Sequence, residues 1–596
     1  MTSTTDPSAA GPSAADSSGA DSSAAGPSAA TSAFRAARDQ LLELRADGAR
    51  ATAEFSWPDV GAHFNWAVDW FDVIAAGNDA VALWIVEEDG SEQKVTFAEM
   101  ARRSDQVANW LTSLGVRRGD HVMLMLGNQV ELWEAMLAIM KVGAVILPTS
   151  TVLGSADLAD RVERAGVRHV IVNPEDAGKF DRVPGGYTRI STGSAGDPAP
   201  DGWTSFADSH GAGAEKPGVV VDTSDPSIIY FTSGTTSKPK MVVHTQESYP
   251  VGHLTTAYWL GVQKHDVHLA ISSPGWGKHA WSCFFAPWIA EATVFVYNYA
   301  KFDPAALRHQ LERARVTTFC APPTVWRMLI QSALGERPTS LREILSAGEP
   351  LNPEVISQVQ RAWGLVIRDG YGQTETTAII ANAPGSQLKA GSMGLPLPGV
   401  HIALVDPLTG ETADEGEICL DLSSPAVNLM AGYYGDPVRS ADVVRDGYFH
   451  TGDVASRDEN GYITFIGRTD DIFKSSDYKV SPFEVESVLI EHPAVAEAAV
   501  VPAPDDTRLN ITKAYVVLAA GWEATEETAL EVLRHARVSL PPFMRVRRLE
   551  FFELPKTSSG KIRRVELRER ENEAAAAGER LPDEWRDDQF AQLKGR

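Results

Sequence analysis

The sequence predicts an α/β fold, with a large N-terminal domain built on mostly parallel sheets and a small α+β domain after it. Three observations predict this. A chain of 596 residues is too long for a single hydrophobic core. From about residue 121, strand-like and helix-like segments alternate, which is typical of right-handed β–α–β units. A β-rich subdomain then ends near residue 468, and the pattern restarts with a helix and two strands.

The first 33 residues are almost entirely Ser, Ala, Gly, Pro, Thr and Asp. Such a segment cannot bury enough apolar surface to offset the loss of chain entropy, so residues 1–33 are predicted to be disordered. They lack the basic and apolar regions of a secretory signal, and no apolar run is long enough to span a membrane. We therefore expect a cytoplasmic protein whose large domain covers residues 34–469.

Two runs of alternating elements define the large domain. In the first run, strands are predicted at 121–126, 144–150 and 169–174, with helices at 130–143 and 155–166. In the second, strands are predicted at 292–298, 317–323, 341–348 and 365–370, with helices at 304–316, 324–332 and 353–364. Apolar strands followed by amphipathic helices are typical of parallel sheets with both faces covered.

A small separate α+β domain is predicted over residues 470–570. Its helix covers 482–492, and its strands cover 495–503 and 512–521. The last residues, 571–596, are charged and rich in alanine, which predicts a surface helix or a frayed tail.

Charge and cysteine content exclude some function classes. A formal net charge of −25 disfavours a general binder of nucleic acid or anionic membranes, although a few local lysines can still hold a phosphate. Cys283, Cys320 and Cys419 lie far apart in the sequence. Their spacing argues against a zinc site and fits a reducing compartment.

Three unusual segments follow predicted strands. They are "TSGTTSKPK" after 228–231, "SAGEPL" at the end of 341–348, and "DGYGQTE" at the end of 365–370. Ligands of open parallel sheets bind beyond the carboxyl ends of the strands, so we expect one crevice lined by all three.

The first segment has the composition of a phosphate cradle. Gly234 lets backbone N–H groups turn toward an anion, and Lys238 and Lys240 add positive charge. Hydroxyl groups come from Thr232, Ser233, Thr235, Thr236 and Ser237. The P-loop pattern does not fit, because Pro239 and Met241 occupy its second glycine and its Ser/Thr position. A flexible surface linker is the alternative reading of this segment.

Three other positions have both a chemical and a structural interpretation. Thr374 can donate to a phosphate and Glu375 can bind Mg²⁺, although the same residues suit a helix N-terminus. Asp453, in "GYFHTGDVA", matches the vicinal hydroxyls of a ribose or serves a turn. Lys561, in "LPKTSSGKIRR", is either a solvated surface lysine or a mobile cation for a negative transition state.

Together these stretches resemble the adenylate-forming superfamily of acyl-CoA synthetases, luciferases and peptide-synthetase adenylation domains. The resemblance runs from about residue 55 to 570 and rests on "YFTSGTTSKPK", "YGQTET", "HTGD", "GRTDDIFKSSDYKVSPFEVE" and "PKTSSGKI", in that order. The likeness is greatest to medium-chain acyl-CoA synthetases, in which "PKM" replaces "PKG" and "GWGKHAW" is similar.

The resemblance implies an ATP-dependent, AMP-forming acyl-CoA ligase that uses ATP, Mg²⁺ and CoA. A medium-chain fatty acid is the first expected substrate, with aryl acids second and short acids third. An enzyme that loads a carrier protein instead of CoA is an alternative, and so is a nucleotide-binding protein without chemistry. The absence of a recognisable carrier domain favours free CoA. The oligomeric state stays open at this point.

The resemblance also implies roles for individual residues in the nucleotide site. Thr232 to Lys240 would hold the β- and γ-phosphates, Thr374 the α-phosphate and Glu375 the metal. Asp453 and Arg468 would hold the ribose, and Lys561 would bridge the substrate carboxylate and the α-phosphate. The adenine and its surroundings would involve Gly348, Glu349, Pro350, Asp369, Gly370, Tyr371, Gly372 and Gln373.

Further roles follow for the acyl group, the acceptor and the domain motion. His244, Trp276 and Gly277 would lie near the acyl group. Asp470 would be the hinge about which a mobile small domain rotates between the half-reactions. CoA would meet Asp477, Tyr478, Lys479 and Arg508. Ser237 and Asp477 replace glycines of the common pattern, and Lys479 replaces an arginine.

Overall fold

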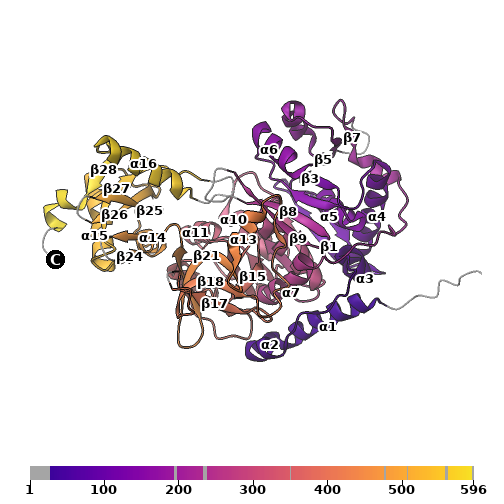
Figure 1. The fold of residues 1–596 in the computed structure, drawn as a ribbon, viewed down its shortest axis with the longest axis horizontal. Helices are drawn as coiled ribbons and strands as arrows, with labels where there is room; N and C mark the ends of the chain where they lie inside the picture. Colours follow the sequence, from indigo (N-terminus) through magenta and orange to yellow (C-terminus); the bar gives the residue numbers. More distant parts are fainter. Residues whose placement is uncertain are drawn as a thin grey trace, which may run out of the picture.

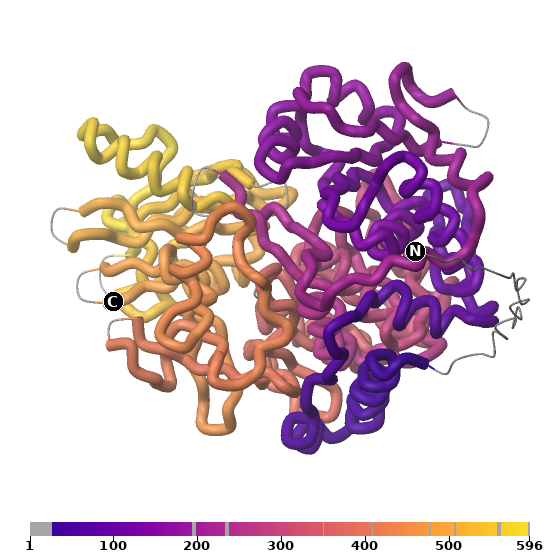
Figure 2. The backbone as a smooth tube through the Cα atoms, turned by 45° about the vertical axis from the view of Figure 1, so that its right-hand side comes forward, coloured from indigo at the N-terminus to yellow at the C-terminus, as the bar shows by residue number. Residues whose placement is uncertain are grey.

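The computed structural model describes residues 27–193, 198–232, 238–349, 351–407, 409–475, 478–505, 508–556 and 562–593. Two mixed sheets, a β-rich subdomain and a small C-terminal domain make up this part of the chain. The small domain, at the yellow end of the chain, lies at one end of the molecule beside the β-rich subdomain (Figures 1 and 2). The α/β fold with a smaller C-terminal domain is therefore confirmed.

The first sheet has eight strands and is parallel except at the edge formed by β9 and β19. Its order is β19 (Gly432–Tyr433), β9 (Lys240–Thr245), β8 (Pro226–Thr232), β4 (Val145–Pro148), β3 (His121–Met125), β5 (His169–Val172), β6 (Thr188–Ser191) and β7 (Thr204–Ser205).

The second sheet has nine strands and is parallel from β14 to β1, with antiparallel strands at both edges. Its order is β16 (Leu395–Pro396), β15 (Thr377–Ala381), β14 (Arg368–Gln373), β13 (Glu343–Ala347), β12 (Thr318–Cys320), β10 (Val267–Ala270), β11 (Thr293–Tyr297), β1 (Val81–Val86) and β2 (Glu92–Thr96).

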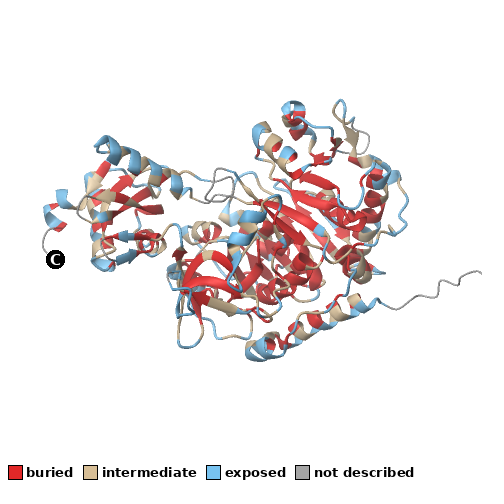
Figure 3. Ribbon diagram, viewed as in Figure 1, coloured by how far each residue is buried: buried red, intermediate tan, exposed pale blue. Residues whose placement is uncertain are grey.

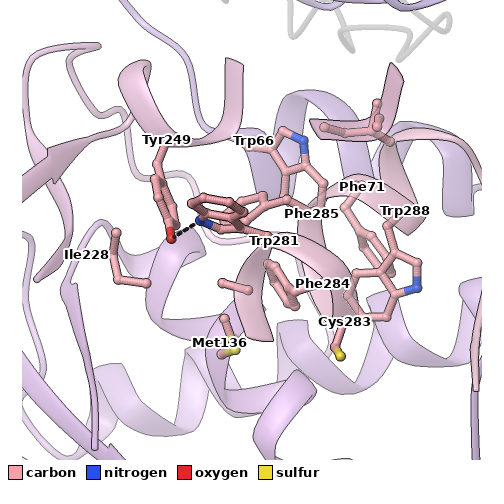
Figure 4. Packing of buried hydrophobic residues seen from close by; sticks show 14 of the residues in the cluster. Trp66, Phe71, Met136, Ile228, Tyr249, Trp281, Cys283, Phe284, Phe285 and Trp288 are labelled. Atoms are coloured by element: carbon pink, nitrogen blue, oxygen red, sulfur yellow. Dashed lines mark hydrogen bonds between the residues drawn. The ribbon is translucent and has the colours of Figure 1, made fainter. Parts of the chain in front are cut away.

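A shared core joins the facing sides of the two sheets. Alternate residues of each sheet, such as Ile146 and Ile228 in one and Val294 and Leu345 in the other, belong to one apolar cluster. The buried strands form the centre of the molecule in Figure 3, and Figure 4 shows the aromatic packing of this cluster. Its helices are α1 (Ala29–Glu43), α2 (Gly48–Glu54), η2 (Trp66–Phe71), α3 (Asp72–Ala75), α4 (Phe97–Ser113), α5 (Val130–Val142), α7 (Ser248–Leu260), α8 (Gly277–Ala280), η5 (Trp281–Phe285) and α9 (Ala286–Ile289).

The outer faces of the sheets have cores of their own. On the first sheet, α6 (Ser155–Ala165) and η3 (Pro174–Arg182) cover the side that carries Met123 and Ile229. On the second, α10 (Pro304–Arg313), α11 (Pro323–Gln331) and α12 (Pro353–Trp363) cover Phe319 and Ile344. The helices differ in burial according to their layer. Helix α6, on the outside, buries one face only, whereas every residue of α7, in the shared core, is buried.

The β-rich subdomain is a five-stranded antiparallel sheet. Helix α13 (Pro437–Val443) precedes its shortest strand. The strands are β17 (Ile402–Val405), β18 (Glu415–Asp421), β20 (Val444–Arg445), β21 (Tyr448–Arg457) and β22 (Ile463–Arg468).

The small domain combines a two-stranded hairpin with a four-stranded sheet. The hairpin is β23 (Phe473–Ser475) and β24 (Tyr478–Val480), and the sheet is β25 (Val495–Asp505), β26 (Leu509–Leu518), β27 (Val546–Phe551) and β28 (Glu584–Arg586). Its helices are α14 (Pro482–Ile490), α15 (Glu526–Ser539) and α16 (Arg564–Ala577).

The two ends of the described chain differ from the sequence expectation. Helix α1 begins at Ala29 with Ser28 as its N-cap, so its first turn lies within the segment expected to be disordered. At the other end, β28 pairs with β27, and Phe590 and Leu593 lie in the core of the small domain. Apolar residues spaced along a charged segment explain why composition alone placed these residues in a tail. None of the helices described is both long and apolar enough to cross a membrane.

Candidate active site

The three segments expected to line one crevice come from both sheets. The segment after β8 belongs to the first sheet, whereas those after β13 and within β14 belong to the second. Two contacts join β9, where the first segment ends, to the turn that ends the third segment. His244 Nε2, on β9, lies 2.7 Å from the backbone oxygen of Thr374, and Lys240, also on β9, meets Tyr433 beside Glu375. The site is therefore built where the edges of two sheets meet.

The segment "DGYGQTE" is mostly strand and not the loop expected from its glycines. Strand β14 continues to Gln373 and pairs antiparallel with β15. A Cβ atom on Gly370 would lie 2.4 Å from the ring of Trp259, and one on Gly372 would lie 1.8 Å from the backbone oxygen of Thr377. These glycines therefore allow close packing of the strand, and the turn falls at residues 374–376.

Asp453, on β21, is held by three side chains. Its Oδ2 accepts hydrogen bonds from the Tyr371 hydroxyl and from Gln373 Nε2, both at 2.6 Å. Its Oδ1 lies 3.2 Å from Arg468 Nη1, and Arg468 Nε lies 3.3 Å from Asp470. Three sequence-predicted residues thus converge on the buried carboxylate of Asp453, and the expected hinge residue Asp470 contacts one of them, Arg468.

The expected turn at Asp453 is instead part of strand β21, which Glu417 fastens next to Asp453. Glu417 Oε1 accepts from the Gly452 N–H at 2.7 Å, and Oε2 lies 2.9 Å from His450 Nδ1. Cys419 Sγ lies 3.5 Å from the same nitrogen, which brings donors of a kind found in metal sites together. The Arg445 guanidinium is 3.2 Å from that nitrogen, and its positive charge opposes a cation there.

Glu375 has a partner that the sequence did not reveal. The hydroxyl of Tyr433 donates to Glu375 Oε1 at 3.0 Å, and Lys240 Nζ lies 3.4 Å from the same hydroxyl. Burial raises the pKa of Tyr433, and the negative charge of Glu375 raises it further. The phenol therefore keeps its proton and stays a donor. The tyrosine doublet of "GYYGDP" was the available signal, but nothing local distinguishes it from a core tyrosine.

The side of the site expected to hold the acyl group is lined by buried aromatic residues. A Cβ atom on Gly277 would lie 3.4 Å from Thr374 Oγ1 and 3.5 Å from the Tyr249 hydroxyl. That hydroxyl accepts a hydrogen bond from Trp281 Nε1 at 3.0 Å, which is drawn in Figure 4. Trp276 is the N-cap residue of α8, directly before Gly277. The missing side chain of Gly277 therefore leaves room beside Thr374.

His244 is a neutral structural element of this wall. Burial lowers its pKa to about 4, and its Nδ1 lies 3.0 Å from Ser248 Oγ. Its contact with the Thr374 backbone fixes the turn after β14. A neutral, fully engaged imidazole supports positioning and not proton transfer at this place.

The end of β13 and the start of β14 form the side expected to hold the adenine. Gly348 has φ +106°, and a Cβ atom there would meet nothing within 4 Å. The Asp369 carboxyl is buried, and burial raises its pKa to about 7. Lys278 Nζ donates to the backbone oxygen of Ala347 at 3.0 Å, which closes this corner.

The small domain contacts the large domain next to this corner, where Asn352 Nδ2 donates to the backbone oxygen of Ser487 at 3.2 Å. Burial disfavours the charge of Arg564, but Glu486, Asp471 and Glu349 outweigh it and raise its pKa. Arg564 binds both oxygens of Glu486, at 3.0 and 2.7 Å. Because Glu349 belongs to the large domain, the positive charge at the start of α16 is attracted toward the side expected to hold the adenine.

Several sequence-predicted residues fall outside the described part of the chain. These are Ser233, Gly234, Thr235, Thr236, Ser237, Pro350, Asp477 and Lys561. Lys556 and Ile562, on either side of 557–561, pair as an isolated β-bridge. Lys238 Nζ lies 3.2 Å from Asp160 on α6, so this lysine contacts the outer layer of the first sheet.

The residues expected to meet CoA lie on the small domain. The ring of Tyr478 stacks on Phe543, with centroids 4.8 Å apart. Lys479 is opposite Lys474 across the β23–β24 hairpin. Arg508 lies at the turn between β25 and β26, where its backbone N–H donates to Asp505 at 2.8 Å. This arrangement exposes an aromatic pair with lysines nearby.

Two atoms of the site are suited to a triphosphate and its metal. Thr232 Oγ1 is buried without a hydrogen-bond partner in the described structure. Glu375 Oε2 likewise meets no protein donor there, whereas Oε1 is held by Tyr433. A hydroxyl donor and a carboxylate oxygen are the groups that phosphate and Mg²⁺ require.

Comparison with known proteins identifies the family. A family model of AMP-binding enzymes matches residues 71–434, and one of the AMP-binding enzyme C-terminal domain matches residues 484–561. The chain belongs to the AMP-binding enzymes. The earlier resemblance to adenylate-forming enzymes is therefore confirmed.

Relatives of this AMP-binding enzyme include CoA ligases for different acids. It is 42% identical over 527 residues to 4-hydroxybutyrate–CoA ligase 1 of Metallosphaera sedula, covering 87% of this chain and 92% of the relative. It is 36% identical over 538 residues to the mitochondrial acyl-coenzyme A synthetase ACSM3 of Mus musculus, covering 86% and 91%.

Solved structures agree with this assignment. The anthranilate CoA ligase AuaEII in complex with anthranoyl-AMP has a TM-score of 0.78 at 28% identity, covering 87% of this chain and 99% of that one. ATP-bound MatB from Rhodopseudomonas palustris has a TM-score of 0.74 at 26% identity, covering 83% and 96%. The protein is accordingly an acid–thiol ligase of the acyl-CoA synthetase type, with ATP, Mg²⁺ and CoA.

Proposed function

We propose that this enzyme activates a short- to medium-chain carboxylic acid with ATP and transfers the acyl group to CoA. A carboxylate oxygen attacks the α-phosphorus, so that an acyl-adenylate forms and pyrophosphate leaves. The CoA thiol then attacks the acyl carbon, and the thioester and AMP are released. The first step brings two anions together, so the surrounding residues must offset their repulsion.

One observation carries the proposal: β9 of the first sheet meets the turn after β14 of the second. Lys240 and His244 on β9 are thereby placed next to Glu375 and Thr374. Positive charge, a hydroxyl and a carboxylate then surround a single region, as a triphosphate with its metal demands. When bound, Mg²⁺ would offset phosphate charge, with Glu375 as its protein ligand.

The remaining residues are proposed to position the reactants. Asp453 would accept hydrogen bonds from the ribose hydroxyls, and its contacts with Tyr371, Gln373 and Arg468 support this role. Thr374 would donate to the α-phosphate, and Lys561 would contact both the acid and that phosphate. We assign the β- and γ-phosphates to Thr232–Lys240. The adenine base is assigned to Gly348, Glu349, Pro350, Asp369, Gly370 and Gly372. CoA is assigned to Asp477, Tyr478, Lys479 and Arg508.

The acid is proposed from the surroundings of Gly277. The Tyr249 hydroxyl, as well as aromatic rings, borders the space next to Thr374. An acid that carries a hydroxyl group on its carbon chain can therefore form a hydrogen bond there. The 42%-identical relative is named for 4-hydroxybutyrate, and the ACSM3 relative is named an acyl-coenzyme A synthetase. The sequence motifs resemble those of medium-chain acyl-CoA synthetases. We therefore propose short hydroxy acids and medium-chain fatty acids as equally preferred substrates, and aryl acids as less preferred ones.

A panel of acids in the ATP–pyrophosphate exchange assay tests the substrate. 4-Hydroxybutyrate, butyrate, hexanoate, octanoate and benzoate are compared at equal concentration, and AMP release is then measured with CoA or with a carrier protein. Exchange that depends on an aliphatic acid, with AMP release on addition of CoA, is expected. Exchange with benzoate alone would favour an aryl-acid ligase, and acyl transfer to a carrier protein alone would refute the CoA assignment.

Lys561→Ala tests the role proposed for this lysine. Pyrophosphate exchange is expected to fall by ~10²–10³-fold or more, the loss typical of a single donor to a charged transition state. Thioester formation from pre-made acyl-adenylate should fall much less, because the phosphate transfer has already occurred. Lys556→Ala, at the other end of the same segment, is the control. Exchange close to wild type in Lys561→Ala contradicts the assignment.

A further inference from the structure

Tyr433 lies between the segment proposed for phosphate binding and the carboxylate proposed for the metal. It is 6% exposed and belongs to β19, whose pairing with β9 places it opposite Val242. Its hydroxyl donates to Glu375 Oε1 at 3.0 Å. Its ring lies under Lys240, with the Nζ atom 5.1 Å from the ring centroid and 3.4 Å from the hydroxyl.

Those contacts constrain Glu375 more tightly than packing alone would. A carboxylate at a turn can rotate, and each rotation exchanges the oxygen offered to a ligand. With Oε1 held by the phenol and the Glu375 backbone oxygen accepting from Met430 N–H at 2.8 Å, the side chain keeps Oε2 for another partner. A preorganised metal ligand binds with a smaller loss of side-chain entropy.

We propose that Tyr433 is a positioning residue that holds Glu375 ready for the Mg²⁺ of the MgATP complex, while its ring seats Lys240. This inference rests on the proposed function. The hydroxyl contacts both Glu375 and Lys240 Nζ, whereas the ring contacts Lys240 alone. Tyr433→Phe removes the hydroxyl contacts and keeps the contact between the ring and Lys240.

The test measures ATP binding by isothermal titration calorimetry as Mg²⁺ is varied. Tyr433→Phe is expected to raise the Mg²⁺ concentration for half-maximal binding about 10–100-fold, the loss typical of removing a hydrogen-bond partner of a metal ligand. Without Mg²⁺, its ATP affinity should stay within about twofold of wild type, because the ring contact with Lys240 remains and the lost contact between Nζ and the hydroxyl, at 3.4 Å, is long for a hydrogen bond. Tyr434→Phe is the matched control, since Tyr434 is 40% exposed and packs against His121.

A double-mutant cycle tests whether Tyr433 affects Mg²⁺ binding through Glu375. If Tyr433 acts through Glu375, the Mg²⁺ effect of Tyr433→Phe should vanish in a Glu375→Gln background. Thermal unfolding of each variant shows that its fold persists. An unchanged Mg²⁺ midpoint in Tyr433→Phe, an equal loss of ATP affinity with and without Mg²⁺, or additive effects in the cycle would each overturn the proposal.

The same experiment separates this inference from the proposed function. Wild type that binds MgATP and supports acid-dependent pyrophosphate exchange, together with an unchanged Tyr433→Phe variant, overturns the role of Tyr433 alone. Wild type that binds no ATP at any Mg²⁺ concentration overturns both.

Discussion

Single residues in this site have ionisation states set by burial. The Asp369 carboxyl, at the start of β14, has its pKa raised to about 7 by burial, and its Oδ1 accepts from the Gly370 N–H at 3.0 Å. On β9, burial lowers the pKa of His244 to about 4. Both shifts favour the neutral form of the side chain, because burial disfavours the charged form.

Asp369→Asn should change how stability depends on pH. The pKa of Asp369 is 3.8 in its ordinary state and about 7 in the fold, so between these values the native state holds a proton that the unfolded chain has lost. The unfolding free energy of wild type therefore falls as pH rises through this window, and asparagine removes that contribution. The stability of the variant relative to wild type should grow from about pH 4.5 to 7 and level off above it.

Urea unfolding of both proteins across that range measures the difference. The opposite contribution of His244 is present in both and cancels. Parallel stability profiles would show that Asp369 is ionised throughout.

At the scale of elements, strand β14 depends on two glycines. Gly370 faces the indole ring of Trp259, whereas Gly372 faces the backbone of Thr377. Thr377 itself has a positive φ of 57°, which marks a tight turn between β14 and β15. The strand thus approaches α7 on one side and its own return strand on the other, and the turn carrying Thr374 and Glu375 is held between them.

Alanine substitutions rank these two contacts. Gly370→Ala should destabilise by about 1–3 kcal/mol, because the ring of Trp259 must shift. Gly372→Ala should cost more, since a backbone oxygen 1.8 Å from the new Cβ cannot move away alone. Gly127→Ala is the control: its nearest contact is 3.8 Å away, and its effect should stay within about 0.5 kcal/mol. The reverse order in denaturant unfolding would place the constraint on the helix side of the strand.

At the scale of the whole molecule, the last residues complete the small domain. Lys513 on β26 is fully buried and lies 2.8, 2.8 and 3.0 Å from Glu550, Glu571 and Glu584. Glu571 belongs to α16 and Glu584 to β28, so the helix that follows Lys561 and the final strand share one buried cation. A charge network of this kind is stable when all its members are present and costly when one is removed.

Truncation after Gly578 should therefore unfold the small domain at a lower temperature. It removes Glu584 together with Phe590 and Leu593 from the core, and burial of two such side chains is worth roughly 3–6 kcal/mol. Calorimetry should show a transition lowered by more than about 10 °C. Truncation after Leu593 removes three residues and should leave the transition unchanged. An unshifted transition in the longer deletion would mean that β28 is dispensable.

The order of elements, the family and most of the proposed site residues could be read from the sequence alone. Strand and helix periodicities reflect local burial, so expected and observed elements such as α5 and α6 agree closely in extent. The motif segments indicated residues such as Asp453 and Tyr371, which the structure does bring together. The glycines of β14 led to the wrong prediction of a loop, because glycine is suited both to loops and to positions where another chain segment packs closely. Only the tertiary contact distinguishes the two cases.

The tertiary structure alone decided which partners each site residue has. Tyr433 lies 58 residues from Glu375 and 193 from Lys240 in the sequence, and it joins them because β19 pairs with β9 at the sheet edge. Such pairing depends on the whole arrangement of strands and leaves no local pattern. The residue types that perform the chemistry were therefore determined by the sequence, whereas the contacts that hold them in place were decided by how two separate sheets meet.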